Sequence, residues 1–492
     1  MSLPILGANT LSAAGFNVAN SCQFDGSSDY LHRTLGTPTN NKIWTFSCWF
    51  KVCQIGEYDQ YFWNTYETGF SRLYIKSSNN TLALDGEDDG NGNGFNLNTN
   101  MVFRDIGSWY HICVAWDVTQ STASNRCKIY INGTQITSWA TETYPGQNVT
   151  NYTFNSAVKH WLGRYKFGSD GTGSYWWDGY FAEFVFIDGS ALAPTSFGEF
   201  NSSTPNTFQP IDVSGLTFGN NGFYLNFADS GDLGDDESGN TNDCTEVGLA
   251  AANQCIDSPT NNLATLNKLH MSDPSSNFFV DNGNNTLEAT NNDVDRLVGV
   301  TIHPQGIKGY FEFKALTDAN WRVALQEDGV AMTKNNYTAL SSGQFYGLDS
   351  SGHLAYANGG SSATLTSGYI SGSTANGDII GCAFDFTGSN RNVWFHKNGT
   401  YGNNGSGTGV PSTGAYPGLT STQLSTTKEF EFLFMCNTGG SSSSIGLNFG
   451  NGNFDGTAIS SAGTNASFGS FEYDVPSGFG PICTKTLNGT YS

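Results

Sequence analysis

The segment Ile43–Val52 reads IWTFSCWFKV and decides the fold class of the chain. Because successive side chains of a β-strand point to opposite faces, this segment places Trp44, Phe46 and Phe50 on one face and Trp49 on the other. A strand with large apolar side chains on both faces is covered by other parts of the protein on both. The segment therefore predicts a central strand in a sheet that packs against further layers.

Similar alternating segments occur on both sides of it, separated by turn sequences such as Asn132-Gly133 and Asn398-Gly399. Regular spacing of short strands and turns is typical of a β-sandwich. The expected strands are Ser71–Ile75, Trp109–Trp116, Arg126–Ile131, Lys159–Arg164, Tyr180–Ile187 and Gly222–Phe227, and in the second half Leu297–His303, Gly309–Ala315, Trp321–Leu325, Gln344–Leu348, Asp378–Phe386, Asn392–His396, Phe430–Cys436 and Ser444–Phe449.

Composition supports the same fold class. Hydrophobic residues make up 38% and aromatic residues 14% of the 492 residues, which is enough for large cores, while 60 glycines favour many tight turns. The length exceeds what one hydrophobic core usually organises. We therefore expect an all-β chain with two antiparallel β-sandwich domains of jelly-roll type in tandem.

Local composition suggests where the domains begin and end. Residues 1–20 are small and weakly polar, which favours an N-terminal arm that orders only against a neighbour. Residues 21–229 form the expected first sandwich. Residues 230–262 include the acidic run GDLGDDESGNTND and are expected to be a linker, because such a sequence lacks the apolar residues to build a core. Residues 263–487 form the expected second sandwich.

The charge of the chain limits its partners. The formal net charge of −22 argues against nucleic acid or an anionic membrane as the main partner, because both repel an acidic surface. No apolar run approaches the ~20 residues of a membrane helix. Residues 1–20 lack a basic start and a continuous apolar segment, so we expect no secretory signal and synthesis in the cytoplasm of a host.

Two segments of the first half resemble a laminin-G-like or concanavalin-A-like jelly roll. The first, Trp109–Thr137, contains WYHICVAW followed by KIYING, and the second, Tyr175–Leu192, contains DGYFAEFVF. In both segments the pattern has a mechanical reason: Trp109 fills the sandwich, and Gly179 lets the backbone curve where a side chain would clash. The resemblance implies a sandwich fold that is widely used to bind carbohydrate.

The second half resembles a SPRY domain, which is a bent sandwich of two sheets. The resemblance rests on GYFEFK (Gly309–Lys314), NGDIIGCAFDFTGSNRNVWFHKNGTY (Asn376–Tyr401), LNFGN (Leu447–Asn451) and the segment Phe471–Leu487. No peptide-binding residue of SPRY proteins is carried over to this sequence.

The tandem as a whole is similar to structural proteins of tailed bacteriophages, cyanophages among them. It shares with them a PILGANT-like start at Pro4–Thr10 and VPSGF at Val475–Phe479. The resemblance implies a virion surface protein, such as a tail-fibre, head-fibre or capsid-decoration subunit, that contacts other virion proteins and a host-surface glycan or receptor. Because repeated weak glycan contacts gain avidity in an oligomer, we expect a homo-oligomer, and specifically a trimer.

Aromatic side chains near strand ends are the candidates for glycan binding, because sugar C–H faces stack on indole and phenol rings. These candidates are Trp63, Tyr66, Tyr175 and Trp176. For each of them a place in the core or in an interface is the alternative.

An acidic loop is the candidate for a metal site. The segment Leu84–Gly94 carries Asp85, Glu87, Asp88 and Asp89, and oxygen-rich loops of this kind can hold Ca²⁺. The loop lacks the ligand order of an EF-hand, so a solvated acidic loop is the alternative. No other cofactor is expected.

No catalytic residue is expected. Glycoside hydrolases on concanavalin-like folds often present an E-x-D-x-E strand, and this motif is absent from the sequence. The ten cysteines fall mostly in strand patterns and are expected to be buried thiols, although Cys244 and Cys255 bracket a loop and can pair in an oxidising medium. The alternatives to a glycan-binding virion protein are a purely structural capsid or tail cement subunit and a polysaccharide-degrading enzyme.

Overall fold

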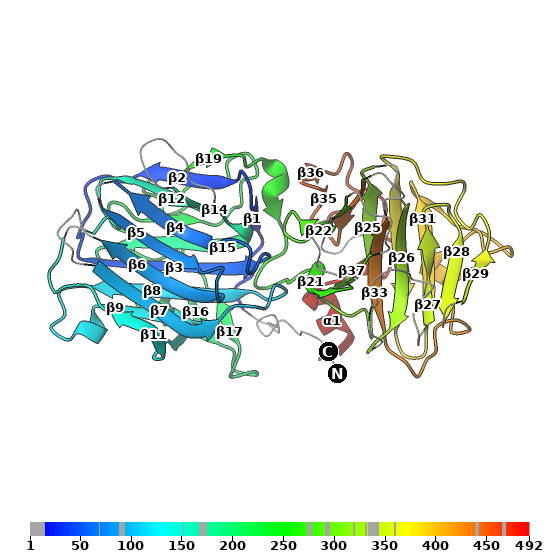
Figure 1. Ribbon diagram of the computed structural model, residues 1–492, viewed down its shortest axis with the longest axis horizontal. Coiled ribbons are helices and arrows are strands. Elements are labelled where there is room, and N and C mark those ends of the chain that lie inside the picture. Colours follow the sequence, from blue (N-terminus) through cyan, green and yellow to red (C-terminus); the bar gives the residue numbers. More distant parts are fainter. Residues whose placement is uncertain are drawn as a thin grey trace. The chain divides into compact units, whose positions relative to one another are not determined.

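The fold of the protein was analysed in a computed structural model (Figure 1). It describes residues 15–67, 69–87, 94–150, 152–166, 175–272, 278–290, 296–317, 320–329, 332, 344–358, 361–437, 442–464 and 469–491. The chain divides after Asn262 into two compact units, which we call the N-terminal and the C-terminal unit. In the described part of the chain, no helix combines the length and apolar character that a bilayer crossing requires.

Two eight-stranded antiparallel sheets form the N-terminal unit. Sheet I has the strand order β10-β9-β8-β3-β15-β1-β20, with β18 also paired to β15. Its strands are β1 (Ser21–Asp25), β3 (Ile43–Val52), β8 (Tyr110–Asp117), β9 (Cys127–Ile131), β10 (Thr134–Gln135), β15 (Asp178–Asp188), β18 (Phe223–Leu225) and β20 (Gln254–Cys255).

Sheet II has the order β11-β7-β6-β5-β4-β12-β2-β19, and Figure 1 shows most of these strands running side by side. Its strands are β2 (Tyr30–Thr34), β4 (Gln60–Tyr66), β5 (Phe70–Ile75), β6 (Thr81–Glu87), β7 (Gly94–Val102), β11 (Trp139–Thr143), β12 (Lys159–Leu162) and β19 (Thr245–Val247). The unit also contains two hairpins, β13 (Arg164–Tyr165) with β14 (Tyr175–Trp176) and β16 (Gly198–Phe200) with β17 (Phe208–Pro210), and the short 3-10 helices η1 (Ala123–Asn125), η2 (Pro194–Ser196) and η3 (Ala251–Asn253).

Strand β3 lies at the centre of sheet I, as its sequence predicts. Trp44, Phe46 and Phe50 point into the core between the two sheets. Trp49 points to the opposite face and packs in a second cluster with Trp109 and Tyr180. Both faces of the strand are therefore covered, which explains why it carries large apolar side chains on both.

Glycine and asparagine occupy the positions that require a positive φ. Asn132 and Gly133 have φ values of 48° and 76°, which fits the tight turn expected between β9 and β10. Gly179 has a φ of 147°, and a Cβ atom there would lie 2.2 Å from the carbonyl oxygen of Lys51. The close approach of β15 to β3 therefore requires glycine, as the sequence suggested.

The C-terminal unit is a second sandwich. Sheet III has the order β21-β24-β33-β26-β27-β28-β29, and sheet IV has the order β22-β23-β34-β25-β30-β31-β32, with β37 also paired to β25. The strands of sheet III are β21 (Leu266–Met271), β24 (Arg296–Val300), β26 (Asn320–Glu327), β27 (Gln344–Asp349), β28 (Leu354–Asn358), β29 (Ser361–Thr366) and β33 (Phe430–Asn437).

The strands of sheet IV are β22 (Phe278–Asp281), β23 (Thr286–Ala289), β25 (Lys308–Ala315), β30 (Ile379–Asp385), β31 (Asn392–Lys397), β32 (Thr400–Tyr401), β34 (Ser443–Asn448) and β37 (Gly480–Pro481). The unit is completed by a hairpin of β35 (Asn453–Phe454) and β36 (Thr457–Ala458), the 3-10 helix η5 (Pro411–Thr413) and the α-helix α1 (Thr484–Tyr491). Edge-to-face contacts join the sheets, for example Phe311 with Phe432 at a centroid distance of 4.9 Å. The expected fold class, all-β with two antiparallel sandwiches, is confirmed.

The region expected to be a linker belongs to the N-terminal unit. Of residues 230–262, β19 extends sheet II by pairing with β2, and β20 extends sheet I by pairing with β1. Within the acidic run, the Asp236 carboxylate accepts hydrogen bonds from the backbone amides of Ser238 and Asn242, and it accepts a third from the amide of Tyr224 on β18. The expectation of a solvated linker was wrong, because this region supplies two strands to the sheets and buries Leu233 and Cys244 in the core between them.

The end of the expected N-terminal arm is also packed, while residues 1–14 lie outside the described residues. Val18 is buried, and its backbone forms hydrogen bonds with the hydroxyls of Ser258 and Thr260. Cys244 and Cys255 are free, buried thiols that lie in two different hydrophobic clusters, which explains why they do not pair.

A fully buried ion pair ties the end of the N-terminal unit to sheet I. The ammonium group of Lys51 lies 2.9 Å from a carboxylate oxygen of Asp257, and neither side chain is exposed. Trp109 donates a hydrogen bond to the other carboxylate oxygen, and Asn262 accepts one from Lys51. Each buried charge is therefore compensated by a charge and by hydrogen bonds, as buried charges require.

We expect Asp257→Ala to lower the free energy of unfolding of the N-terminal unit by about 3 to 5 kcal/mol, because it leaves the Lys51 ammonium group buried without its counter-charge. Calorimetric melting of the full chain measures the change. Asp212→Ala is the control, since Asp212 is exposed. Equal melting temperatures for the two variants would contradict a structural role of the ion pair.

A buried hydrogen-bonded chain connects three side chains of sheet IV. The Glu312 carboxylate accepts hydrogen bonds from the Tyr310 hydroxyl, 2.8 Å away, and from the amides of Glu472 and Tyr473. The same hydroxyl lies 2.7 Å from Nε2 of His396. Burial raises the pKa of Glu312 to about 7, although the hydrogen bonds oppose this, and burial lowers the pKa of His396 to about 3.

The raised pKa of Glu312 makes the C-terminal unit less stable as the pH rises. A carboxyl group that is more basic in the folded state contributes stability below its unfolded pKa, near 4.5, and this contribution is lost as the pH rises through about 7. Between pH 4.5 and pH 8 we expect the free energy of unfolding of the C-terminal unit to fall by about 3 kcal/mol in the unaltered protein. Glu312→Gln should abolish this decrease. Melting across this range, with the exposed Glu429→Gln as control, tests it; parallel profiles for Glu312→Gln and the unaltered protein would refute it.

Candidate functional site

The outer face of sheet II carries aromatic and polar side chains at alternate positions. On β5, Leu73 and Ile75 point into the core, so Arg72 and Tyr74 point outward. On β6, Leu84 points inward and Asp85 outward. The pleat of these strands therefore builds a row of rings and charged groups on the side of the sheet that faces away from sheet I.

Five tyrosines gather on this face, and we call them the tyrosine platform: Tyr58, Tyr61, Tyr74, Tyr165 and Tyr175. The ring of Tyr61 lies at its centre and stacks on Tyr74 at 4.9 Å and on Tyr165 at 4.7 Å. The ring of Tyr175 lies 6.4 Å from Tyr61 and 6.5 Å from Tyr58. The platform thus extends from buried rings to an exposed one, since Tyr61 is 2% and Tyr175 is 41% exposed.

The hairpin of β13 and β14 supplies the exposed part of the platform. Tyr165 and Tyr175 are partners in its register, and their rings lie 6.1 Å apart. The amide of Lys166 donates a hydrogen bond of 2.9 Å to the side chain of Asn64 on β4, which fixes the hairpin against sheet II. The two rings are therefore held by backbone pairing rather than by a single flexible side chain.

An ion pair orders the edge of the platform. The Arg72 guanidinium donates two hydrogen bonds to the Asp85 carboxylate, at 2.8 and 3.0 Å, and the Tyr74 hydroxyl donates a third at 3.0 Å. Asp85 is the main cause that raises the pKa of Arg72 against the effect of burial. Burial raises the pKa values of Tyr61 and Tyr74, so their hydroxyls stay protonated at neutral pH and remain hydrogen-bond donors.

The predicted glycan-binding residues have different locations. Tyr175 lies in the platform, and Trp176 follows it on β14, half-buried beneath the guanidinium of Arg164. Tyr66 is half-buried at the end of β4. The prediction that Trp63 contacts a glycan is wrong. Trp63 is 1% exposed and packs in the core against Trp44 and Phe154, because a bulge in β4 turns it inward.

Tyr61, Tyr74 and Tyr165 were not predicted as site residues. Their signal was present in the sequence, because Tyr61 and Tyr74 alternate with core residues in QYFWNTY and FSRLYI. Alternation alone does not distinguish a solvent-facing ring from one that a second layer covers. That distinction depends on which parts of the chain cover the outer face of sheet II.

The expected calcium loop is not supported where the structure describes it. Asp85 is turned toward Arg72 and Tyr74, which occupy both of its carboxylate oxygens. Glu87 is exposed at the end of β6, and Asp88 and Asp89 lie outside the described residues. Among the described residues, no three acidic, histidine or cysteine side chains form a group able to hold a metal ion.

A serine and a histidine meet in sheet I, but solvent does not reach them. The Ser47 hydroxyl lies 2.8 Å from Nε2 of His111. His111 is 0% exposed and lies against the rings of Trp49 and Phe208. Burial lowers its pKa to about 3, so it stays neutral, and no substrate can approach the hydroxyl. The contact is structural.

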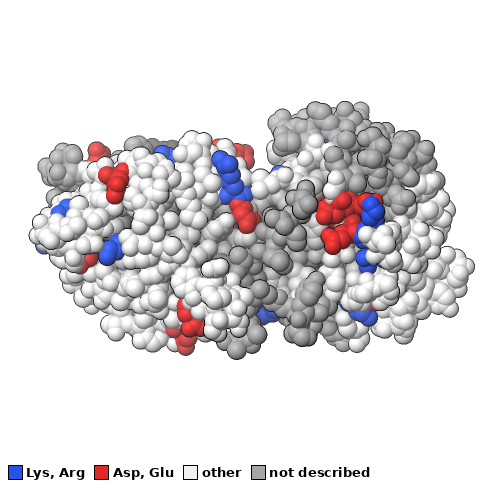
Figure 2. Space-filling model, turned by 90° about the horizontal axis from the view of Figure 1, so that it is seen from below, with Lys and Arg blue, Asp and Glu red and all other residues white. Residues whose placement is uncertain are grey.

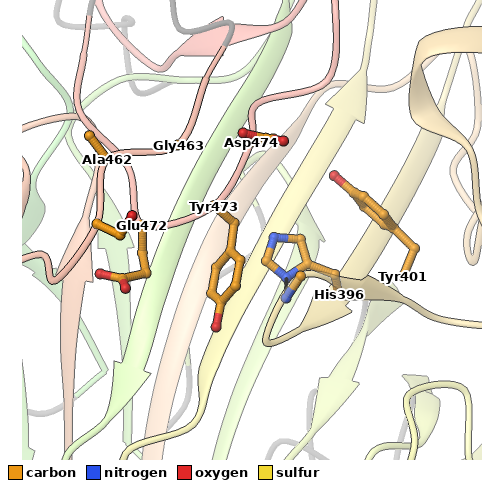
Figure 3. A pocket seen from close by; sticks show the side chains of 9 residues that line it. His396, Tyr401, Ala462, Gly463, Glu472, Tyr473 and Asp474 are labelled. Atoms are coloured by element: carbon orange, nitrogen blue, oxygen red, sulfur yellow. Dashed lines mark hydrogen bonds between the residues drawn. The ribbon is translucent and has the colours of Figure 1, made fainter.

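The C-terminal unit has a pocket of about 320 Å³ on sheet IV, shown in Figure 3. Its floor is the ring of His396, which lies between Tyr401 and Tyr473 at centroid distances of 5.1 and 5.3 Å. The lining residues are His396, Gly399, Tyr401, Ser461, Ala462, Gly463, Glu472, Tyr473 and Asp474.

The acidic residues of this pocket form hydrogen bonds with residues of the loop that lines it. Asp474 accepts two hydrogen bonds from Thr464, and Glu472 accepts one from the amide of Ser460. The hydroxyl of Tyr401 is buried, and no hydrogen-bond partner for it is found among the described residues. The pocket is therefore lined by aromatic rings and by the hydroxyl-bearing residues Tyr401, Ser461 and Tyr473, while its two acidic side chains form hydrogen bonds with neighbouring loop residues.

Residues 25–195 match the family model described as the Concanavalin A-like lectin/glucanases superfamily. The matched segment contains the whole tyrosine platform. Among curated proteins, no sequence matches this chain.

Several solved structures are similar to parts of the chain. Domains LG4-5 of the mouse laminin alpha1 chain are 10% identical, with 80% of each chain covered and a TM-score of 0.28. The SPRY domain of human HERC1 is 18% identical over 37% of this chain and 96% of that domain, with a TM-score of 0.26. The SAP-like pentraxin of Limulus polyphemus is 17% identical over 36% of this chain and 80% of that one, with a TM-score of 0.27. By the family match alone, residues 25–195 of the N-terminal unit are similar to the Concanavalin A-like lectin/glucanases superfamily.

Proposed function

We propose that the N-terminal unit binds carbohydrate on the tyrosine platform. The single observation that carries the proposal is the stack of Tyr61, Tyr165 and Tyr175, which runs from the buried surface of sheet II to solvent. A pyranose ring presents C–H groups that pack on such a ring face, and its hydroxyls require polar partners nearby. The superfamily whose model matches this segment is named for lectins as well as glucanases, and the lectins support the same function.

The polar groups around the platform are better suited to hydrogen-bonding a sugar hydroxyl than to catalysing a reaction. The two oxygens of Asp85 accept hydrogen bonds from Arg72 and Tyr74, so this carboxylate is already engaged within the protein. Hydrolysis of a glycosidic bond requires two carboxyl groups on either side of it. We therefore propose binding without cleavage.

The setting that we propose is the surface of a virus particle, where the chain attaches the particle to a host glycan. This part rests on the resemblance of the sequence to structural proteins of tailed bacteriophages. Display of several copies would raise the avidity of weak glycan contacts, and a homo-oligomer such as a trimer would provide them.

We expect Tyr175→Ala to weaken glycan binding about three- to tenfold, because one ring contact contributes about 0.5 to 1.5 kcal/mol. An array of neutral and acidic polysaccharides identifies a ligand for the full chain, and calorimetric titration with that ligand measures the change. Tyr416→Ala is the control, since Tyr416 is 45% exposed in the other unit.

Three outcomes would contradict the proposal. Equal affinities for Tyr175→Ala and Tyr416→Ala would place the ligand elsewhere. Binding to no glycan on the array would favour a purely structural subunit of a capsid or tail. Release of reducing ends from any polysaccharide would establish an enzyme.

A further inference from the structure

Three buried polar side chains meet on the face of sheet I that points away from sheet II: Lys51 on β3, and Asp257 and Asn262 at the end of the N-terminal unit. Charged side chains usually lie in solvent, and Figure 2 shows such groups on one face of the molecule. Lys51 and Asp257 are instead 0% exposed, and Asn262 is 1% exposed. Chemistry between these three side chains is therefore shielded from water.

A tight reversal of the chain brings Asp257 and Asn262 together. Ser258 and Asn261 exchange backbone hydrogen bonds of 3.2 and 2.9 Å in a short antiparallel bridge. Asp257 and Asn262 flank this bridge in the sequence, so they lie opposite each other. Both side chains reach Lys51, whose ammonium nitrogen lies 2.9 Å from Oδ2 of Asp257 and 2.9 Å from Oδ1 of Asn262.

The side-chain amide of Asn262 lies within reach of the Lys51 nitrogen. Its carbonyl carbon is bonded to Oδ1 at ~1.23 Å, so the carbon is no more than about 4 Å from that nitrogen. Its Nδ2 donates a hydrogen bond of 2.7 Å to the carbonyl oxygen of Gly107. The amide is thus fixed at both ends, and groups that a fold holds in this way react as if they were at a very high concentration.

Asp257 is placed to transfer a proton to and from Lys51. While Oδ2 of Asp257 contacts the Lys51 nitrogen, its Oδ1 accepts a hydrogen bond of 2.9 Å from the indole of Trp109. The ring of Tyr180 lies 5.7 Å from the same nitrogen and belongs with Trp109 to one apolar cluster. In such surroundings a carboxylate can take a proton from an adjacent ammonium group, since this converts two buried charges into two neutral groups.

We propose that Lys51 and Asn262 form an intramolecular isopeptide bond, with Asp257 as the group that transfers protons. Asp257 accepts a proton from the Lys51 ammonium group, and the resulting amine forms a bond from Nζ to Cγ of Asn262. Asp257 returns the proton to Nδ2 of Asn262 as the bond between Cγ and Nδ2 breaks. The second proton that Nζ loses leaves with the ammonia as an ammonium ion, so the reaction needs neither an oxidant nor a cofactor.

Two acyl groups contact Lys51, and Asn262 is the better electrophile. The negative charge of a carboxylate resists attack by an amine, whereas a primary amide is uncharged. If Asp257 were the acyl group, it could not serve at the same time as the proton acceptor. The arrangement therefore favours loss of ammonia from Asn262 over loss of water from Asp257.

The bond would tie the end of the N-terminal unit to the central strand of sheet I. Lys51 belongs to β3, and Asn262 lies 211 positions further along the chain. A covalent link between such distant residues restricts the unfolded chain and holds the sheet closed when its hydrogen bonds open. This inference is independent of the proposed glycan binding, since none of the three residues belongs to the tyrosine platform.

The intact mass of the denatured full chain tests the bond directly. We expect the mass of the sequence less that of one ammonia molecule, and a branched peptide in which Lys51 is joined to Asn262. Lys51→Met and Asn262→Ala should each show the full mass of the variant sequence. Lys128→Met is the control, because Lys128 is half-buried on β9 of the same sheet, and this variant should still lose ammonia.

A second variant tests the role of Asp257. Asp257→Asn keeps the size of the side chain and removes the proton acceptor, and general acid–base catalysis contributes about 100-fold or more to a rate. We therefore expect the bond to form at least about 100-fold more slowly in Asp257→Asn than in the unaltered chain. The intact mass, followed over time after cell-free synthesis, measures both rates.

Four outcomes would overturn the proposal or part of it. A full sequence mass for the unaltered chain after long incubation excludes the bond, and this result depends on no variant. Loss of ammonia that persists in Lys51→Met shows that the ammonia comes from another asparagine. Loss of water with a branch at Asp257 removes Asn262 as the electrophile. Equal rates for Asp257→Asn and the unaltered chain remove Asp257 as the proton carrier.

Discussion

The packing of sheet I against sheet II is the constraint on which the candidate site depends. It fills the space between the sheets with Trp44, Phe50 and Trp63, and it requires the apolar side chains of β4, β5 and β6 to point inward. Because the period of a strand is two, the remaining side chains must point outward. The tyrosine platform is therefore a direct consequence of how the core is filled, and a shift of one residue in β5 would bury Arg72 and expose Leu73.

The charged side chains of the N-terminal unit have different kinds of partner. Lys51 and Asp257 are buried and compensate each other, and Arg72 is paired with Asp85 at the edge of the platform. These pairs hold parts of the chain in place and leave no charge available to a ligand. The ammonium groups of Lys159 and Lys166 lie instead near the ring of Trp161, at 5.9 and 5.7 Å.

The two units use buried polar groups in a similar way but differ on their surfaces. In the C-terminal unit, Glu312, Tyr310 and His396 form a hydrogen-bonded chain beneath a pocket whose acids support their own loop. In the N-terminal unit, Arg72 and Asp85 pair on the outer face of sheet II, beside stacked rings that extend from buried Tyr61 to exposed Tyr175. The arrangement makes the N-terminal unit the better candidate for sugar binding, and it makes the C-terminal unit sensitive to pH through Glu312.

The sequence by itself determined the fold class, the central strand β3, the turn at Asn132-Gly133 and the need for glycine at position 179, because each of these depends on local periodicity or on backbone conformation. The sequence also indicated Tyr175 as a candidate residue for glycan binding. Only the tertiary structure decided that Trp63 is buried, that residues 230–262 complete the sheets of the N-terminal unit, and that Lys159, Arg164 and Lys166 meet around Trp161 and Trp176. The physical reason is that which face of a strand is covered, and which charges become neighbours, depends on strands far apart in the sequence that pair only when the sheets close.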